Sequence, residues 1–227
     1  KMSEVKRLGE KYLQHMINLR ETIHMYPEDG FSEFTTSKII IEELEKLGIK
    51  VQKNVAKTGV VGLIEGKYPG KTVLLRADMD ALKIQEQADV EYKSKIDGMM
   101  HACGHDGHAS IGLTTARILM ELSEHLHGTL KIIFQPAEEG VRGAKSICES
   151  GFLDDVDYIY AAHIMPRDDD YDLYFGMNES FATTKLDVIY HGVSTHAAES
   201  PQFGKNALLS AANCIINLHS IPRNSDG

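Results

Sequence analysis

The sequence predicts a protein of the α/β class. Amphipathic helix patterns alternate with short apolar segments along the chain, and several of these segments end in acidic or metal-binding side chains. Open sheets flanked by helices produce this alternation, and their ligands collect outside the carboxyl ends of the strands. The chain has 227 residues and is 42% hydrophobic, which is enough for one good core and part of a second domain.

Two helices are predicted at the start of the chain. Apolar side chains recur at steps of three and four from Val5 to Ile23, so the first helix ends before Pro27. The second helix runs from about residue 36 to residue 47. Gly48 follows it directly and is placed to cap it at the C′ position.

Short apolar strands are predicted next, around residues 60–64 and 73–75. Residues 67–70, Lys-Tyr-Pro-Gly, have the composition of a turn, so we expect a hairpin or two adjacent strands. Asp78 and Asp80 follow at the carboxyl end of the second strand. They alternate onto one face, so both can point at an ion or at a ligand of that ion. The alternative is a capped turn.

The run MHACGHDGH, residues 100–108, is the most informative stretch of the chain. A thiolate and an imidazole are donors that divalent transition ions share with carboxylates. Only Gly104 separates Cys103 from His105, and in a loop both can converge on one ion. A solvated histidine-rich turn is the alternative. A helix is predicted from about residue 106 to residue 122, and the macrodipole at its N-terminus would favour a thiolate at Cys103.

Two further strands end in candidate ligands. The segment 128–135 is predicted to be a buried strand, and Glu138 and Glu139 follow it. Adjacent side chains on extended backbone point in different directions, so one carboxylate can bind an ion while the other faces the substrate. A solvated acidic turn is the alternative. The apolar segment 158–166 contains His163 near its end, where a core histidine is the alternative.

Composition excludes several classes of partner. The net charge of −9 argues against a nucleic-acid or anionic membrane surface as the partner. No apolar run is long enough to span a bilayer, and the charged start of the chain is not a secretory signal. Three cysteines form no even disulfide framework, so we expect a cytoplasmic protein in which Cys103 stays reduced.

A change of pattern near residues 176–184 predicts a second unit. Beyond it the sequence is typical of a strand, a long loop and a helix from about residue 206 to residue 219. We therefore expect a catalytic metal-binding domain over residues 1–180 and the start of another domain over residues 181–227. Because a lone strand cannot form a stable sheet, the chain is expected to be a fragment of a longer protein.

The motifs RADMDAL, MHACGHDGH, FQPAEEG, AAHIMP and STHAAESP resemble, in this order, the di-metal metallopeptidase superfamily that contains the aminoacylases, peptidase family M20. The resemblance is strongest to its amidohydrolase branch of N-acyl-amino-acid, hippurate and indole-acetyl-amino-acid hydrolases. Residues 182–227 are similar to the p-aminobenzoyl-glutamate hydrolase A-subunit group. The resemblance implies a three-layer α/β/α catalytic domain and a smaller α+β, ferredoxin-like lid or dimerisation domain.

The resemblance also implies a metal centre with two divalent ions per subunit, Mn²⁺ or Zn²⁺, with Co²⁺ or Ni²⁺ possible. Glu138 would be the general base, which takes a proton from the attacking water and passes it to the leaving amine. His101 and His108 would support the loop. The implied metal ligands are Cys103, His105, Glu139 and His163.

Other roles follow from the same resemblance. Asp80 matches an aspartate that orients a ligand, whereas Asp78 stands where other branches place a ligand histidine. His196 matches a lid histidine that enters a partner protomer's active site, where it binds the oxyanion or the substrate carboxylate. The implied assembly is a homodimer or a hetero-oligomer with a related subunit. Asn206 is a candidate substrate contact, with a helix N-cap as its alternative.

The predicted function is hydrolysis of the amide bond of a small N-acyl or N-aroyl amino acid. The sequence departs from the family in two ways: it lacks a further metal-binding histidine that relatives supply from a C-terminal segment, and Lys83 stands where many relatives have proline. Two alternatives stay open. One is a thiol hydrolase with Cys103 as nucleophile and His105 or His163 as base. The other is a non-catalytic, truncated binding subunit.

Overall fold

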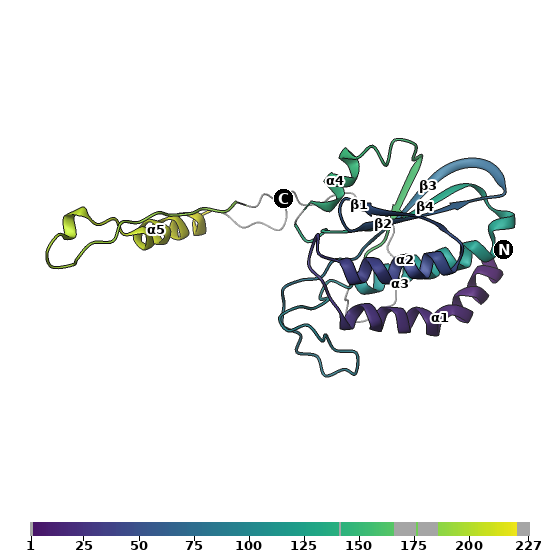
Figure 1. Ribbon diagram of the computed structural model, residues 1–227, viewed down its shortest axis with the longest axis horizontal. Helices are drawn as coiled ribbons and strands as arrows, with labels where there is room; N and C mark the ends of the chain where they lie inside the picture. The colour runs from purple at the N-terminus through teal and green to yellow at the C-terminus, as the bar shows by residue number, and fades with distance from the viewer. Residues whose placement is uncertain (1, 141, 166–175, 177–185, 222–227) are drawn as a thin grey trace. The chain divides into compact units, whose positions relative to one another are not determined.

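The computed structural model describes residues 2–140, 142–165, 176 and 186–221 (Figure 1). The chain divides into two compact units, residues 1–169 and residues 170–227. Most of the predicted boundary at 176–184 lies outside the described residues. The assignment of residues 1–180 to a catalytic domain and of residues 181–227 to a lid domain stays a prediction.

The first two helices form as their apolar periodicity predicts. Helix α1 spans Met2–Met25 and α2 spans Phe34–Lys46. Gly48 has a φ of 74°, and its amide donates to the carbonyl of Glu45 at 2.9 Å, so the predicted C′ cap of α2 is confirmed. Both helices bury apolar side chains in the same core cluster, α1 mainly by packing on the helix α3, His105–Glu121, and α2 by packing on the first two strands of the sheet; these side chains are Leu19, Ile23, Ile40 and Leu44.

The described part of the first unit holds a five-stranded mixed sheet with the order β1-β2-β4-β3-β5. Strand β4 pairs antiparallel with β2 and parallel with β3, and β5 pairs parallel with the other edge of β3. Strand β1 pairs antiparallel with β2 and was not predicted from the sequence. The bounds are Lys50–Val55 for β1, Gly59–Glu65 for β2, Tyr68–Asp78 for β3, His127–Gln135 for β4 and Tyr158–Ala161 for β5.

The predicted hairpin or adjacent pair between residues 60–64 and 73–75 is wrong, because β4 lies between them. Leu130 of β4 is the register partner of Ile64 on one side and of Val73 on the other. The run of three apolar residues from Ile132 to Phe134 is almost fully buried, so this strand takes a central position in the sheet. The predicted turn at 67–70 mostly belongs to the start of β3, where Tyr68 is the register partner of His127 in β4.

Helices cover the two faces of the sheet unequally, which gives the predicted three-layer α/β/α arrangement (Figure 1). Helix α3, His105–Glu121, lies with α1 and α2 on one face, where Ile132 and Phe134 of β4 are buried. Ile133 points to the opposite face and packs with Ile147 of α4, Gly143–Glu149. The alternation of side chains along β4 therefore builds two cores.

The second unit contains the predicted helix but not the predicted strand. Helix α5 spans Ala207–His219. Residues 186–190 have no regular structure, and Val193 makes only an isolated bridge with Lys205. A strand requires a neighbour that accepts and donates its backbone hydrogen bonds, and the described residues of this unit supply only that single bridge. None of the helices in the described ranges combines the length and apolarity needed to cross a membrane.

Candidate metal centre

The candidate ligands gather where the parallel strands of the sheet end. Asp78 and Gln135 are register partners at the carboxyl ends of β3 and β4. The segments that follow these strands carry Asp80, Glu138 and Glu139 to the same edge, as expected for an α/β sheet. Strand β5 ends at Ala161, earlier than predicted, so His163 lies in the loop after it rather than on the strand.

The predicted ligands and the predicted base fall into two overlapping groups of donor atoms. Cys103, His105 and His163 offer donor atoms within 4.8 Å of one another, and so do His105, Glu138 and Glu139. The Sγ of Cys103 lies 3.4 Å from Nε2 of His163. The structure therefore brings together all four predicted ligands and the predicted base. His105 is the residue common to both groups.

The donors fit a metal ion. Nε2 of His105 and Oε1 of Glu139 are buried and have no hydrogen-bond partner among the described residues, although buried polar atoms are nearly always paired. These two atoms are 3.9 Å apart. One bond to nitrogen and one to oxygen, each about 2.0–2.2 Å long, are together long enough to bridge this gap, so one divalent ion between the two atoms would satisfy both.

Asp80 is arranged to orient His105. The carbonyl oxygen and Oδ1 of Asp80 lie 2.9 and 3.2 Å from Nδ1 of His105, so the ring proton is on Nδ1 and the Nε2 lone pair faces the gap. Oδ2 of Asp80 accepts the amide of Glu139 at 2.9 Å. Burial raises the pKa of Asp80, but the hydrogen bonds from His105 and Glu139 outweigh it and hold that pKa below its usual range. This is the geometry expected of a carboxylate that aligns a metal ligand.

The surroundings of Cys103 do not favour a free thiolate. Burial, followed by the hydrogen bond to Glu139 and the negative charges of Glu139, Glu138 and Asp78, raises the pKa of Cys103 to about 12. The predicted effect of the α3 macrodipole is therefore outweighed. A nucleophilic cysteine needs a lowered pKa, so this environment argues against the thiol hydrolase. A bound cation would reverse the balance and stabilise the thiolate.

His196 and Asn206 belong to the second unit. Nδ1 of His196 accepts the amides of Ala198 and Glu199, both at 3.2 Å, so its proton lies on Nε2. Oδ1 of Asn206 accepts the amide of Leu209 at 3.3 Å, which confirms the N-cap alternative for Asn206. A substrate contact by either side chain stays a prediction.

Glu33 is a buried residue next to the site that the sequence did not indicate. Its carboxylate accepts the amide of Ala137 at 2.8 Å and the hydroxyl of Thr58 at 2.5 Å. Burial raises the pKa of Glu33 despite these hydrogen bonds. Ala137 has a φ of 54°, an unusual backbone conformation immediately before Glu138. An acidic residue directly before α2 suggests an N-cap from sequence alone, yet this side chain instead fixes the loop that follows β4.

Glu33→Ala is expected to lower the free energy of unfolding by about 2–4 kcal/mol, because two buried donors lose their acceptor. Urea denaturation of the metal-free protein measures the change. Glu33→Gln is the control, since an amide can still accept from Ala137 and donate to Thr58, and it should stay near wild type. Equal losses in both variants would show that these two hydrogen bonds are not the cause.

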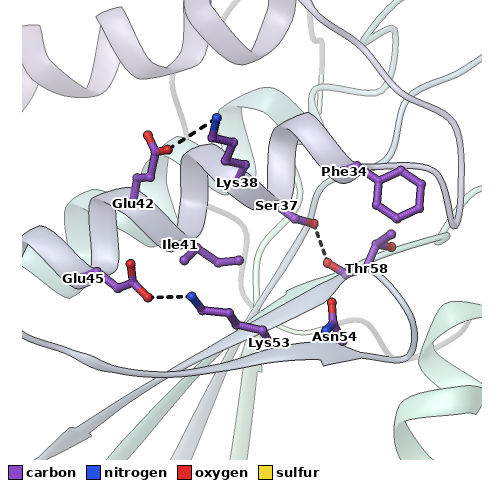
Figure 2. A pocket seen from close by; sticks show the side chains of 9 residues that line it. All are labelled: Phe34, Ser37, Lys38, Ile41, Glu42, Glu45, Lys53, Asn54 and Thr58. Carbon is purple, nitrogen blue, oxygen red and sulfur yellow. Dashed lines mark hydrogen bonds and ion pairs between the residues drawn. The ribbon is translucent and has the colours of Figure 1, made fainter.

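The pocket in Figure 2 contains none of the candidate ligands. It lies between α2 and the segment around β1. Its lysines are paired within the pocket, Lys38 with Glu42 at 3.9 Å and Lys53 with Glu45 at 2.7 Å. With its cations already paired, this pocket offers no charge for an anionic substrate.

Comparison with known proteins agrees with this chemistry. Residues 74–218 match the sequence profile of peptidase family M20/M25/M40. An indole-3-acetyl-aspartic acid hydrolase of Enterobacter agglomerans is 36% identical over 95% of this chain and 60% of its own length. A subunit of the p-aminobenzoyl-glutamate hydrolase of Escherichia coli K12 is 36% identical over 92% of this chain and 58% of its own length. The chain thus spans about 60% of the length of these curated relatives.

Two solved structures show the same fold. A dinuclear metal-binding peptidase of the M20 family from Bacillus subtilis is 41% identical, with a TM-score of 0.67 over 69% of this chain and 44% of that protein. An aminobenzoyl-glutamate utilization protein from Klebsiella pneumoniae is 26% identical, with a TM-score of 0.70 over 99% of this chain and 62% of that protein.

Proposed function

Because the chain belongs to peptidase family M20/M25/M40, we propose that the whole protein is a metal-dependent amidohydrolase of N-acyl or N-aroyl amino acids. The observation that carries the proposal is a pair of buried atoms, His105 Nε2 and Glu139 Oε1, which lie 3.9 Å apart beside Glu138 and have no hydrogen-bond partner in the described part of the chain. Relatives named for the hydrolysis of indole-3-acetyl-aspartate and of p-aminobenzoyl-glutamate support this substrate class.

The proposed cofactor is a pair of divalent ions, Mn²⁺ or Zn²⁺, with Co²⁺ and Ni²⁺ as acceptable substitutes. A set of one thiolate, two imidazoles and a carboxylate accepts any of these first-row ions. When bound, the ions would lower the pKa of water and polarise the amide carbonyl. The proposed ligands are Cys103, His105, Glu139 and His163.

Glu138 is the proposed general base. Its side chain is 40% exposed, so it can face substrate and solvent, and its Oε2 lies 3.9 Å from Nε2 of His105. From this position the carboxylate takes a proton from the attacking water. It then delivers the proton to the nitrogen of the leaving amino acid, which completes the cleavage. Asp80 holds His105 in the required tautomer during both steps.

The second unit supplies the proposed substrate contacts. With its proton on Nε2, the His196 ring is a hydrogen-bond donor, which is what a developing oxyanion or a substrate carboxylate requires. We propose that His196 serves the active site of a partner protomer, in a homodimer or in a complex with a related chain. One relative is named as a subunit of its hydrolase, which is in line with such an assembly.

We also propose that the protein is located in the cytoplasm. All three cysteines are free thiols in the structure. A reducing compartment would keep Cys103 available to bind a metal ion.

A substrate panel tests the proposed function. Full-length protein loaded with Mn²⁺, Zn²⁺ or Co²⁺ is offered aroyl-glutamates, indole-acetyl-aspartate and hippurate, and the released amine is measured. We expect kcat/KM for at least one of them to reach about 10⁴ M⁻¹s⁻¹, the lower end of ordinary enzymes. The free acid and amine serve as the product control. A protein that binds two ions but cleaves none of these amides would be the non-catalytic binding subunit.

A further inference from the structure

His108 contacts the proposed metal centre but uses both of its ring nitrogens elsewhere. Nε2 accepts the backbone amide of Ile164 at 2.9 Å. An amide nitrogen can only donate, so the proton of the ring must be on Nδ1. Nδ1 in turn lies 2.5 Å from Oδ1 of Asp78 and donates to it. Neither nitrogen has a lone pair left for an ion.

Asp78 fixes the orientation of this ring. Its side chain is fully buried, and its Oδ2 lies 2.6 Å from the guanidinium of Arg76. A carboxylate held between Arg76 and His108 accepts from Nδ1 and keeps the Nε2 lone pair pointed at Ile164.

The peptide groups of Ile164 connect His108 to His163. While its amide donates to His108, its carbonyl oxygen lies 2.7 Å from Nδ1 of His163. That hydrogen bond places the proton of His163 on Nδ1, so its Nε2 lone pair faces Cys103 Sγ at 3.4 Å. The His108 and His163 rings also meet edge to face, with centroids 4.6 Å apart.

The start of α3 is shaped to receive the Ile164 side chain. The δ-methyl of Ile164 lies directly over Gly107, where a Cβ would approach it to 2.5 Å. Its Cβ lies 3.6 Å from the position of a Cβ on Gly104. Ile164 is therefore held at the start of α3 in two ways: its side chain packs on Gly104 and Gly107, and its amide donates to His108.

We propose that His108 is a positioning residue that acts through Ile164 to aim His163 at the metal ions, and that His108 is not itself a ligand. The inference rests on the proposed metal centre. Asp78, His105 and His108 also bring donor atoms within 4.8 Å of one another, which is the competing assignment of a metal site. The two assignments differ in the partner of His108. As a positioning residue it accepts the Ile164 amide at Nε2, whereas as a ligand it would use a nitrogen lone pair to bind the ion.

Two substitutions separate the two nitrogens of His108. The amide of asparagine can replace Nδ1 and keep the bond to Asp78, but it does not reach Ile164. The longer glutamine can replace Nε2 and accept from the Ile164 amide. We expect His108→Asn to weaken the binding of one ion by about 10- to 100-fold, the usual effect of losing a partner that orients a ligand. His108→Gln should stay within about threefold of wild type, because the orienting bond is retained.

Zn²⁺ titration of full-length protein against a competing chelator measures these affinities. A double-mutant cycle with His163→Ala completes the test, because His108→Asn should have no further effect once His163 is absent. Equal losses in the Asn and Gln variants, or an undiminished effect of His108→Asn in the His163→Ala background, would overturn the proposal.

Hydrogen exchange of the Ile164 amide in metal-free protein provides a second measurement. The Ile164 amide should stay protected in wild type and in His108→Gln and lose protection in His108→Asn. This measurement does not depend on metal affinity, so it remains informative if a variant binds metal poorly for another reason. Unchanged protection in His108→Asn would also overturn the proposal. Wild-type protein that binds no ion but protects Ile164 would refute the metal centre while leaving the hydrogen bond itself established, so the two failures are distinguishable.

Discussion

We expect Glu138→Ala to lower kcat by about 10²- to 10⁴-fold and to leave both proposed metal ions bound, because general acid–base catalysis contributes a factor of this size. The side chain is 40% exposed and its Oε2 is 3.9 Å from His105 Nε2, so it lies at the solvent-facing side of the donors. Steady-state kinetics with the best substrate of the panel and elemental analysis of the purified variant measure the two effects.

Glu139→Ala is the matched control for Glu138→Ala. Its Oε1 is buried and unpaired among the described side chains, and it faces His105, so its loss should reduce metal content as well as turnover. Near-normal turnover of Glu138→Ala would refute the assignment of the base. Loss of metal from that variant, with metal retained in Glu139→Ala, would reverse the roles of the two glutamates.

Exhaustive chelation is expected to reduce activity at least about 10³-fold, because Lewis-acid stabilisation contributes several kcal/mol and each 1.36 kcal/mol is tenfold in rate. Addition of Mn²⁺, Zn²⁺ or Co²⁺ should restore it. The metal-free protein should also react slowly with thiol-alkylating reagents at neutral pH, since burial and the neighbouring carboxylates raise the pKa of Cys103 to about 12.

The thiol-hydrolase mechanism predicts the opposite results for chelation and for alkylation. A catalytic cysteine would keep its activity after chelation and lose it on alkylation. Apo protein, metal-loaded protein and protein alkylated before metal loading, compared side by side, therefore distinguish the two mechanisms. Activity that survives chelation in the first sample would rule out the metal mechanism.

Local pattern was enough to predict most helices and four of the five strands of the sheet, β1 being the exception. The apolar periodicity of α1, the glycine after α2 and the buried run of β4 are each visible within a window of about twenty residues or fewer. The order of the strands was not visible in this way. The prediction that β2 and β3 are neighbours failed because β4, which begins at His127, pairs with both.

Some residues of the candidate site were likewise predictable from local sequence and others were not. Cys103, His105, Glu138 and Glu139 stand out because their chemistry is concentrated in short motifs at predicted strand ends. Glu33 and Ile164 carry no such signal: one looks like a helix cap, and the other acts through its backbone. Their roles depend on contacts with Ala137 and His108, which lie 104 and 56 residues away along the chain.

The central position of β4 determines when the metal centre can form as the chain folds. Both sheet neighbours of β3, β4 and β5, come later in the sequence, so β3 has no partner until residue 127 has been synthesised. Cys103 and His105, the first residue of α3, leave the ribosome before that strand, while Glu139 and His163 leave after it. The complete set of proposed ligands is therefore available only after all five strands have been synthesised. Because these ligands come from segments that the sheet brings together, metal uptake during synthesis would report that this edge of the sheet has formed.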